Sequence, residues 1–291
     1  MKIKNQVICD LRPYNSPEAM QKISRITNTV LLLVPKEMDD RTKAAYATIE
    51  KQNIVSEVAV DSTLQPVVYN GNCTLNNTMI PDRESFLILN GNCRIESLSR
   101  EKSVKIIANG NLLYDVRSEA QIEILQSNGT CFAVNLDKLI EIPDCGTLTE
   151  AVLSDDPETT YLCSGAMMIV PRLAQQAVGT VIAPIVVADS SVRDTRLALK
   201  SGMIFYRDQV TESTEVKKQM NKLRISADFL KQLSGKLVIF NTRHVLIDKS
   251  VTPELLREKV LLFFNIHHLK ATRQTLDTVQ LLAENVKILT K

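Results

Sequence analysis

The chain has 291 residues, enough for a large buried core or for two domains. Its hydrophobic fraction of 44% and charged fraction of 23% are ordinary for a folded protein, and a net charge of +2 gives no global attraction to nucleic acid or anionic lipid. An aromatic content of 4% without Trp argues against nucleic-acid binding by base stacking and against a Trp-lined sugar cleft.

The N-terminal residues show no secretory signal, and the apolar run Val30–Pro35 is too short to cross a bilayer. Six cysteines are scattered along the chain, and no two have the Cys-x-x-Cys spacing of zinc or redox motifs. We therefore expect a cytoplasmic protein with reduced thiols.

The first 60 residues predict two units made of a helix followed by a strand. Ser16-Pro17-Glu18 is typical of a helix start, with a cap, a proline and an acid in the first turn. Asn28 suits the left-handed residue that closes a helix, and the run Val30–Val34 reads as a buried strand. Asn53 repeats this pattern after a second helix expected over about Asp40–Lys51.

The middle of the chain repeats one turn at a fixed period. Asn-Gly-Asn begins at Asn70, Asn90 and Asn109, and a degraded copy begins at Asn128, so the spacings are 20, 19 and 19 residues. Each turn lies between short aliphatic runs, and Asn-Gly tolerates the positive φ that tight turns need. A constant period near 20 favours a β-solenoid over the alternative, the hairpins of an antiparallel sheet.

A solenoid would stack equivalent side chains. We expect Asn72, Asn92 and Asn111, or the asparagines two residues before them, to lie within about 5 Å of one another from coil to coil. Cys73 and Cys93 occupy equivalent positions, with Leu112 in the next copy, and are expected to be buried, reduced and free of metal. A disulfide or metal ladder is the lesser alternative.

The segment Cys145–Gln209 is less periodic, but Thr180–Ala188 predicts consecutive strands with a corner at Pro184. Helical periodicity over Thr211–Leu233 predicts a linker helix or a boundary between zones. After it, Leu237–His244 aligns with Leu261–His268 at an offset of 24, and Leu282–Leu289 is a possible third copy.

Two further features concern this C-terminal part. Thr252-Pro253-Glu254 repeats the helix-start pattern, with Asn265 downstream. Gly235 leaves two registers open. If it closes the helix Ser226–Leu233, Leu237–Phe240 forms a strand before Asn241; otherwise the strand of this unit follows Asn241.

The Asn-Gly-Asn coils, over about residues 60–140, resemble in period and turn type the bactofilins, bacterial β-solenoid proteins that polymerise end to end. The terminal units depart from that class because they contain helices. In outline they are similar to leucine-rich repeats, but they do not meet the L-x-x-L-x-L-x-x-N-x-L pattern.

Few residues suggest chemistry. His244 and His268 would be neighbours in stacked coils and His267 is adjacent, but no carboxylate repeats beside them. The acid pairs Asp39-Asp40 and Asp155-Asp156 sit at turns or helix starts, where capping is the simplest role. The last 81 residues hold 14 Lys and Arg against 8 Asp and Glu, which solvated faces explain better than an anionic partner. We predict no catalytic, cofactor-binding or metal-binding residue.

Together these patterns predict an elongated α/β solenoid with β-rich central coils of period about 20 and helix-containing terminal repeats of period about 24. The expected zones are residues 1–60, 61–210 and 211–291. A solenoid without catalytic groups predicts a non-enzymatic cytoplasmic scaffold or self-assembling binding surface. The alternative is a β-helix enzyme acting on carbohydrate or surface polymer. We expect a homo-oligomer, a twofold dimer in which helix-containing ends act as caps, with Val260–Phe264 as the contact unless that run lies in the core.

Overall fold

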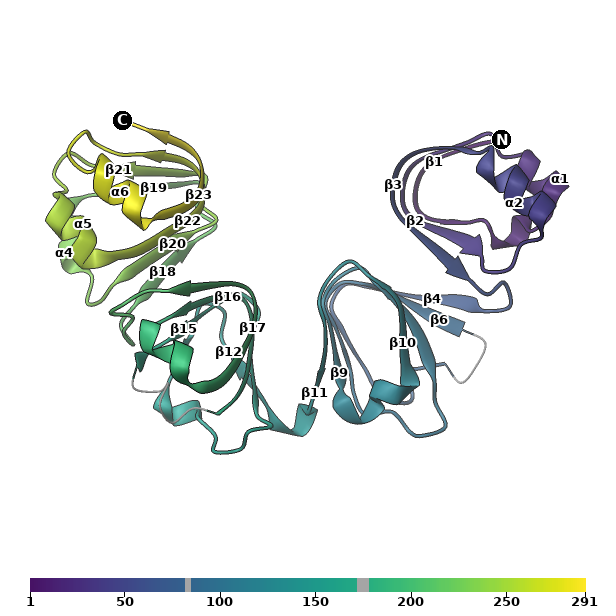
Figure 1. The fold of residues 1–291 in the computed structure, drawn as a ribbon, viewed down its shortest axis with the longest axis horizontal. Coiled ribbons are helices and arrows are strands. Elements are labelled where there is room, and N and C mark those ends of the chain that lie inside the picture. The colour runs from purple at the N-terminus through teal and green to yellow at the C-terminus, as the bar shows by residue number, and fades with distance from the viewer. Residues whose placement is uncertain (82–84, 172–177) are drawn as a thin grey trace. The chain divides into compact units, whose positions relative to one another are not determined.

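The computed structural model describes residues 1–81, 85–171 and 178–291, and the chain divides into two compact units, Met1–Leu136 and Asp137–Lys291. The fold is α/β and β-rich, with few helices and curled sheets (Figure 1). Every strand pairing in the described ranges is parallel, so the antiparallel-hairpin alternative is wrong. No helix within these ranges is long and apolar enough to cross a membrane.

The first unit holds three sheets with strand orders β1-β2-β3, β10-β8-β6-β4 and β11-β9-β7-β5. Its strands are β1 (Lys2–Asp10), β2 (Arg25–Pro35), β3 (Glu50–Val60), β4 (Gln65–Asn70), β5 (Cys73–Leu75), β6 (Ser85–Asn90), β7 (Cys93–Ile95), β8 (Val104–Ala108), β9 (Leu112–Asp115), β10 (Ile122–Ser127) and β11 (Cys131–Val134). Its helices are η1 (Arg12–Tyr14), α1 (Pro17–Gln21), α2 (Asp40–Ala47), η2 (Val116–Gln121) and the first residue of η3 (Leu136–Lys138).

In this unit β1, β2 and β3 curve together around α1 and α2 (Figure 1). The concave side buries Met20, Ile26 and Leu32. A second cluster joins this sheet to the Asn-Gly-Asn strands through Leu31 and Phe86, both almost fully buried. A third cluster, which includes Leu87 and Ile106, lies among the Asn-Gly-Asn strands, so aliphatic side chains from successive parallel strands form three clusters along the unit.

The second unit holds two sheets with orders β12-β14-β16-β15-β13, to which β17 adds, and β18-β20-β22-β21-β19, to which β23 adds. Its strands are β12 (Leu139–Ile142), β13 (Thr147–Leu148), β14 (Thr160–Cys163), β15 (Ala166–Ile169), β16 (Val178–Ala188), β17 (Arg196–Tyr206), β18 (Glu215–Lys218), β19 (Lys222–Ile225), β20 (Leu237–Phe240), β21 (His244–Ile247), β22 (Val260–Lys270) and β23 (Ala283–Thr290). Its helices are η4 (Glu150–Val152), η5 (Ser190–Asp194), α4 (Ala227–Gln232), α5 (Pro253–Lys259) and α6 (Leu276–Leu282).

In this unit β16 and β22 are long strands, and each pairs with two shorter strands in succession. β16 pairs with β14 through Thr160–Leu162 and then with β15 through Ala166–Ile169. The exposed Pro184 lies between the two pairings, at the predicted corner, but Val178–Ala188 forms one strand and not the predicted consecutive strands. In the same way β22 pairs first with β20 and then with β21. Paired residues are 24 positions apart in the sequence, as predicted, over Val238–Phe240 and from His244 onward. The structure thus selects the register with a strand before Asn241.

The predicted helix starts are confirmed. Ser16, Asp39 and Thr252 each cap a helix by accepting a backbone N–H three residues ahead, and Ser226 does the same for α4. The N–H of Thr42 donates to Asp39 Oδ1 at 2.6 Å. This hydrogen bond lowers the pKa of Asp39, because it stabilises the ionised carboxylate.

The predicted ends of the first helices are wrong. Asn28, Asn53 and Asn265 have φ of 54°, 55° and 51°, as expected for left-handed residues, but they lie inside β2, β3 and β22 rather than at helix ends. α1 closes earlier, where the N–H of Lys22 bonds to the carbonyls of Ala19 and Met20. A single left-handed residue lets each strand turn while its pairing continues on both sides.

The predicted linker helix over Thr211–Leu233 is also wrong for most of its length. β18 and β19 occupy this segment, and only α4 is helical. Lys222–Ile225 alternates exposed and buried residues, which is the period of a strand. Gln219 has φ of 53° and interrupts any helix between the two strands. Parallel pairing with β20 and β21 therefore overrides the helical spacing of Val216 and Met220.

Candidate functional site: amide rows and a basic groove

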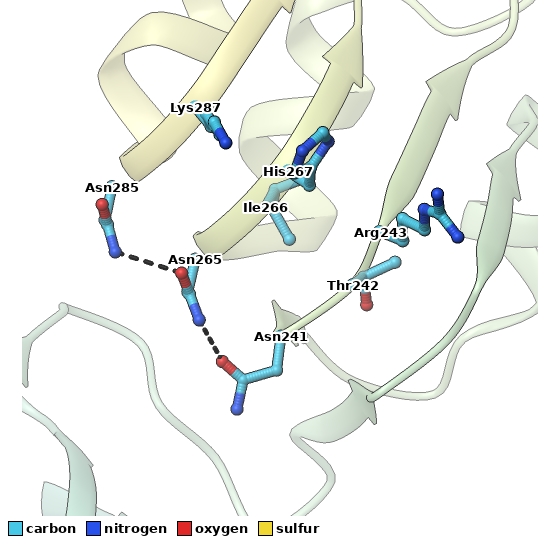
Figure 2. Close-up of a pocket in the computed structure, with 8 residues that line it drawn as sticks. All are labelled: Asn241, Thr242, Arg243, Asn265, Ile266, His267, Asn285 and Lys287. Atoms are coloured by element: carbon cyan, nitrogen blue, oxygen red, sulfur yellow. Dashed lines mark hydrogen bonds between the residues drawn. The ribbon is translucent and has the colours of Figure 1, made fainter. Parts of the chain in front are cut away.

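Asparagine side chains form hydrogen-bonded rows across the strands. In the first unit Asn28 Nδ2 donates to Asn5 Oδ1 at 2.9 Å, and Asn53 Nδ2 donates to Asn28 Oδ1 at 3.0 Å. In the second unit Asn265 Nδ2 donates to Asn241 Oδ1 at 2.7 Å, and Asn285 Nδ2 donates to Asn265 Oδ1 at 3.1 Å (Figure 2). All six of these asparagines have φ between 51° and 55°.

The Asn-Gly-Asn turns carry two further rows. The first asparagines, at 70, 90, 109 and 128, are linked side chain to side chain at 2.8 to 2.9 Å. The third residues form a row in which the backbone N–H of Asn92 donates to Asn72 Oδ1 at 3.0 Å, with the same bond from Asn111 to Asn92 and from Thr130 to Asn111. The predicted asparagine ladder is confirmed in both positions.

Stacking also explains the glycine of each turn. A Cβ on Gly110 would lie 2.3 Å from the carbonyl oxygen of Gly91, and a Cβ on Gly129 would lie 2.3 Å from that of Gly110. Gly71, in the first copy, has φ of 85° and no atom of the described residues within 4 Å of its Cβ position. Close approach of successive turns therefore requires glycine in the later copies, in addition to any turn preference.

Each side-chain row has a direction. In all three side-chain-to-side-chain rows the later asparagine donates its Nδ2 and the earlier one accepts on Oδ1. The first residue of a row thus keeps an Nδ2 donor, and the last keeps an Oδ1 acceptor. Asn5 lies on β1 and Asn285 lies on β23, the first and the last strand of the chain.

The row in the second unit borders an open groove of about 480 Å³. Figure 2 shows it together with the side chains that line it: Asn241, Thr242, Arg243, Asn265, Ile266, His267, Asn285 and Lys287. Arg243, His267 and Lys287 each follow a row asparagine by two residues, so the sheet register brings three basic side chains beside the amides. The groove is therefore lined by amides and by the cationic side chains of Arg243 and Lys287, with His267 on the strand between them.

Histidine rings cluster beside Arg243 at this groove. His244, next to Arg243, has its ring centroid 5.7 Å from that of His268 and 6.4 Å from that of His267. Burial and then the charges of Arg243, His268, His267 and Lys222 lower the pKa of His244. The sequence correctly placed His244 opposite His268. Among the described residues no group of three His, Cys, Asp or Glu side chains is arranged to hold a metal ion.

The cysteine prediction is right in part. Cys93 is buried, whereas Cys73 is only half-buried, because it lies on the outer strand of its sheet. The two are register partners, with their Sγ atoms 2.9 Å apart, and all six cysteines are free thiols. Burial, followed by the hydrogen bond with Cys73, raises the pKa of Cys93 to about 12.

The acid pairs have structural contacts. Asp39 caps α2, and Asp156 forms an ion pair with Lys138 at 2.7 Å. The basic row beside the groove was missed by sequence reasoning. Its signal is present in the sequence as asparagine followed two residues later by a base, at Asn241, Asn265 and Asn285.

Comparison with known proteins finds no matching family model, no matching curated protein and no matching solved structure. The likeness to bactofilins and leucine-rich repeats therefore stays an interpretation of the sequence.

Proposed function

We propose that this protein is a non-enzymatic cytoplasmic scaffold, built as a β-solenoid whose coils are closed by turns and short helices, and that it acts by self-assembly. Parallel strands stacked in register and amide rows that repeat every 19 to 25 residues support a solenoid. Solenoids present long, regular surfaces and typically bind or assemble through them.

The observation that carries the proposal is the state of the outermost strands. β1 pairs only with β2, and β23 pairs only with β22, within the described chain. No residue of β23 is buried, whereas its neighbour β22 is buried along most of its length. An open strand edge presents unpaired backbone N–H and C=O groups, and such edges add further strands.

The groove gives the scaffold a second surface. Its three basic side chains and its amides suit an acidic segment of a protein partner. No carboxylate of the described residues lines it, whereas glycoside hydrolysis needs a pair of carboxylates. The groove therefore favours binding over the alternative of an enzyme acting on carbohydrate.

The contact expected from the sequence has to be revised. Val260–Phe264 lies in the core, where Phe263 is fully buried and Phe264 is 6% exposed. This run is not available to a second copy. The open edges of β1 and β23 replace it as the contact in the proposed homo-oligomer.

Size-exclusion chromatography with light scattering tests the proposal. We expect a mass above the 32.6 kDa of one chain, rising with protein concentration toward a defined oligomer or a fibre. A mass of one chain at every concentration, including millimolar, overturns self-assembly.

A further inference from the structure

The open edges of β1 and β23 differ in one respect that bears on how copies can join. At β1, Asn5 accepts from Asn28 and keeps its own Nδ2 group as an outward donor. At β23, Asn285 donates to Asn265 and keeps its Oδ1 as an outward acceptor. Two β1 edges would bring donors together and two β23 edges would bring acceptors together, whereas β1 against β23 pairs a donor with an acceptor.

The backbones of β1 and β23 also have the same local conformation at these asparagines. Both asparagines are left-handed, with φ of 55° and 51°, so both strands turn at the same point. Inside the protein, strand pairing keeps such asparagines at the same level. In the first unit the residues that flank Asn5 pair with those that flank Asn28, Lys4 with Thr27 and Gln6 with Thr29. The residues flanking Asn265 and Asn285 show the same register.

From these observations we propose that β23 of one copy pairs in parallel with β1 of a second copy, with Asn5 level with Asn285 and its Nδ2 donating to Asn285 Oδ1. This inference rests on the proposed self-assembly and adds its direction, which is head to tail. The contact is heterologous, so it closes into a ring or continues as a fibre according to the rotation between copies. It replaces the twofold contact between identical patches that the sequence had suggested.

The proposed register places compatible side chains opposite one another. Lys4 comes level with Glu284, which is exposed and also forms an ion pair with Arg207 of its own chain. Ile8 comes level with Ile288, which is 43% exposed in the isolated chain and would be covered by the join. Opposite charges and apolar pairs across adjacent strands are the contacts that stabilise a sheet.

Two variants block one edge each. Lys4→Glu with Asn5→Asp acts on β1, since it sets one carboxylate opposite Glu284 and another opposite Asn285 Oδ1, while the new aspartate keeps the acceptor that Asn28 uses and tolerates a left-handed φ. Ile288→Asp acts on β23 by placing a carboxylate against the apolar Ile8. Circular dichroism and thermal unfolding of each variant check that the fold is kept.

A matched control changes charge by the same amount away from both edges. Lys231→Glu with Asn77→Asp alters one lysine and one asparagine, and the new aspartate keeps the acceptor that the backbone N–H of Ser99 uses. This control should assemble as the wild type does. Loss of assembly in the control would mean that net charge, rather than the β1 edge, explains the first variant, and would overturn the assignment.

The decisive measurement is complementation in sedimentation velocity. Each edge variant alone should be a monomer, with the dissociation constant raised at least tenfold, and an equimolar mixture should form a one-to-one dimer through the intact β23 of one and the intact β1 of the other. Assembly of either variant alone, or no dimer in the mixture, overturns the head-to-tail join while leaving self-assembly in place. A monomeric wild type overturns both.

Discussion

Asn265 in the middle of an amide row provides a test of backbone and side-chain roles together. Its side chain makes two hydrogen bonds, at 2.7 Å to Asn241 and 3.1 Å from Asn285, and its φ is 51°. Two substitutions separate these roles. Asn265→Gly removes both bonds but accepts the left-handed backbone, and Asn265→Ala removes both bonds and strains the backbone.

The expected free energies follow from these terms. Each amide hydrogen bond contributes about 0.5–1.5 kcal/mol net, and exposure to water puts these two near the lower end, for about 1 kcal/mol in total. Glycine adds about 0.5–1 kcal/mol of chain entropy, and a left-handed alanine adds about 1–2 kcal/mol of strain. We therefore expect losses of about 1.5–2 kcal/mol for Asn265→Gly and about 2–3 kcal/mol for Asn265→Ala.

The order of the two variants is the diagnostic result. At an ordinary strand position the alanine variant is more stable than the glycine variant. The opposite order at position 265 would confirm the left-handed backbone. Urea unfolding followed by circular dichroism measures both losses, provided that the slope m is unchanged. Asn221, which is exposed, lies in the bend before β19 and is not among the positive-φ residues, so it is the control for a backbone without positive φ and should show alanine as the more stable variant. An alanine variant at 265 as stable as the glycine variant refutes the reasoning.

Three further predictions concern stacking, pH and thiol reactivity. Gly110→Ala should cost about 1–3 kcal/mol in the same unfolding assay, because its Cβ meets a carbonyl oxygen at 2.3 Å, whereas Gly71→Ala, with open space around it, should cost about 1 kcal/mol of backbone strain. The hydrogen bond from the Arg224 guanidinium, followed by hydrogen bonds from Ser250, lowers the pKa of Asp248 to about 2, so the stabilisation is present above the unfolded pKa near 3.8 and is lost as pH falls through 2. Asp248→Asn should therefore flatten the stability profile between pH 4 and 2, and an unchanged profile contradicts these contacts. With its pKa raised to about 12, Cys93 should stay unalkylated in native protein at pH 8 while half-buried thiols react, and mass spectrometry showing equal rates would rule out its burial.

The repeat could be predicted from the sequence, but the path of the backbone could not. The spacing of Asn70, Asn90 and Asn109 was enough to predict side chains stacked in a row, because only residues at equal positions in successive strands recur so evenly. The left-handed conformation of Asn28 was also predicted, from residue type alone. Its location within a strand was not, because asparagine suits a left-handed φ at a helix end and in a strand equally well.

The remaining differences between the predicted and the observed elements depend on which strands pair with one another. The segment around Val216 has helical spacing, but it became a strand because β20 offers a parallel edge, which a single-sequence pattern does not show. Half-burial of Cys73 has the same origin, since its strand is the outermost of its sheet. The basic side chains of the groove fall in one row only after the register of β21, β22 and β23 is known.

Row direction explains why the two ends of the chain are unlike. A carboxamide has a donor on one side and an acceptor on the other, so a row of them linked in one sense leaves a donor at one end and an acceptor at the other. Every side-chain row within the described ranges runs in the same sense, from the later strand to the earlier one. Parallel strands have identical backbone orientation, so each asparagine of a row projects its amide at the same angle as the one before it. The β1 edge therefore presents an amide donor and the β23 edge presents an amide acceptor. Asn5→Asp tests this difference, because it removes the outward donor of Asn5 and keeps the acceptor that Asn28 uses.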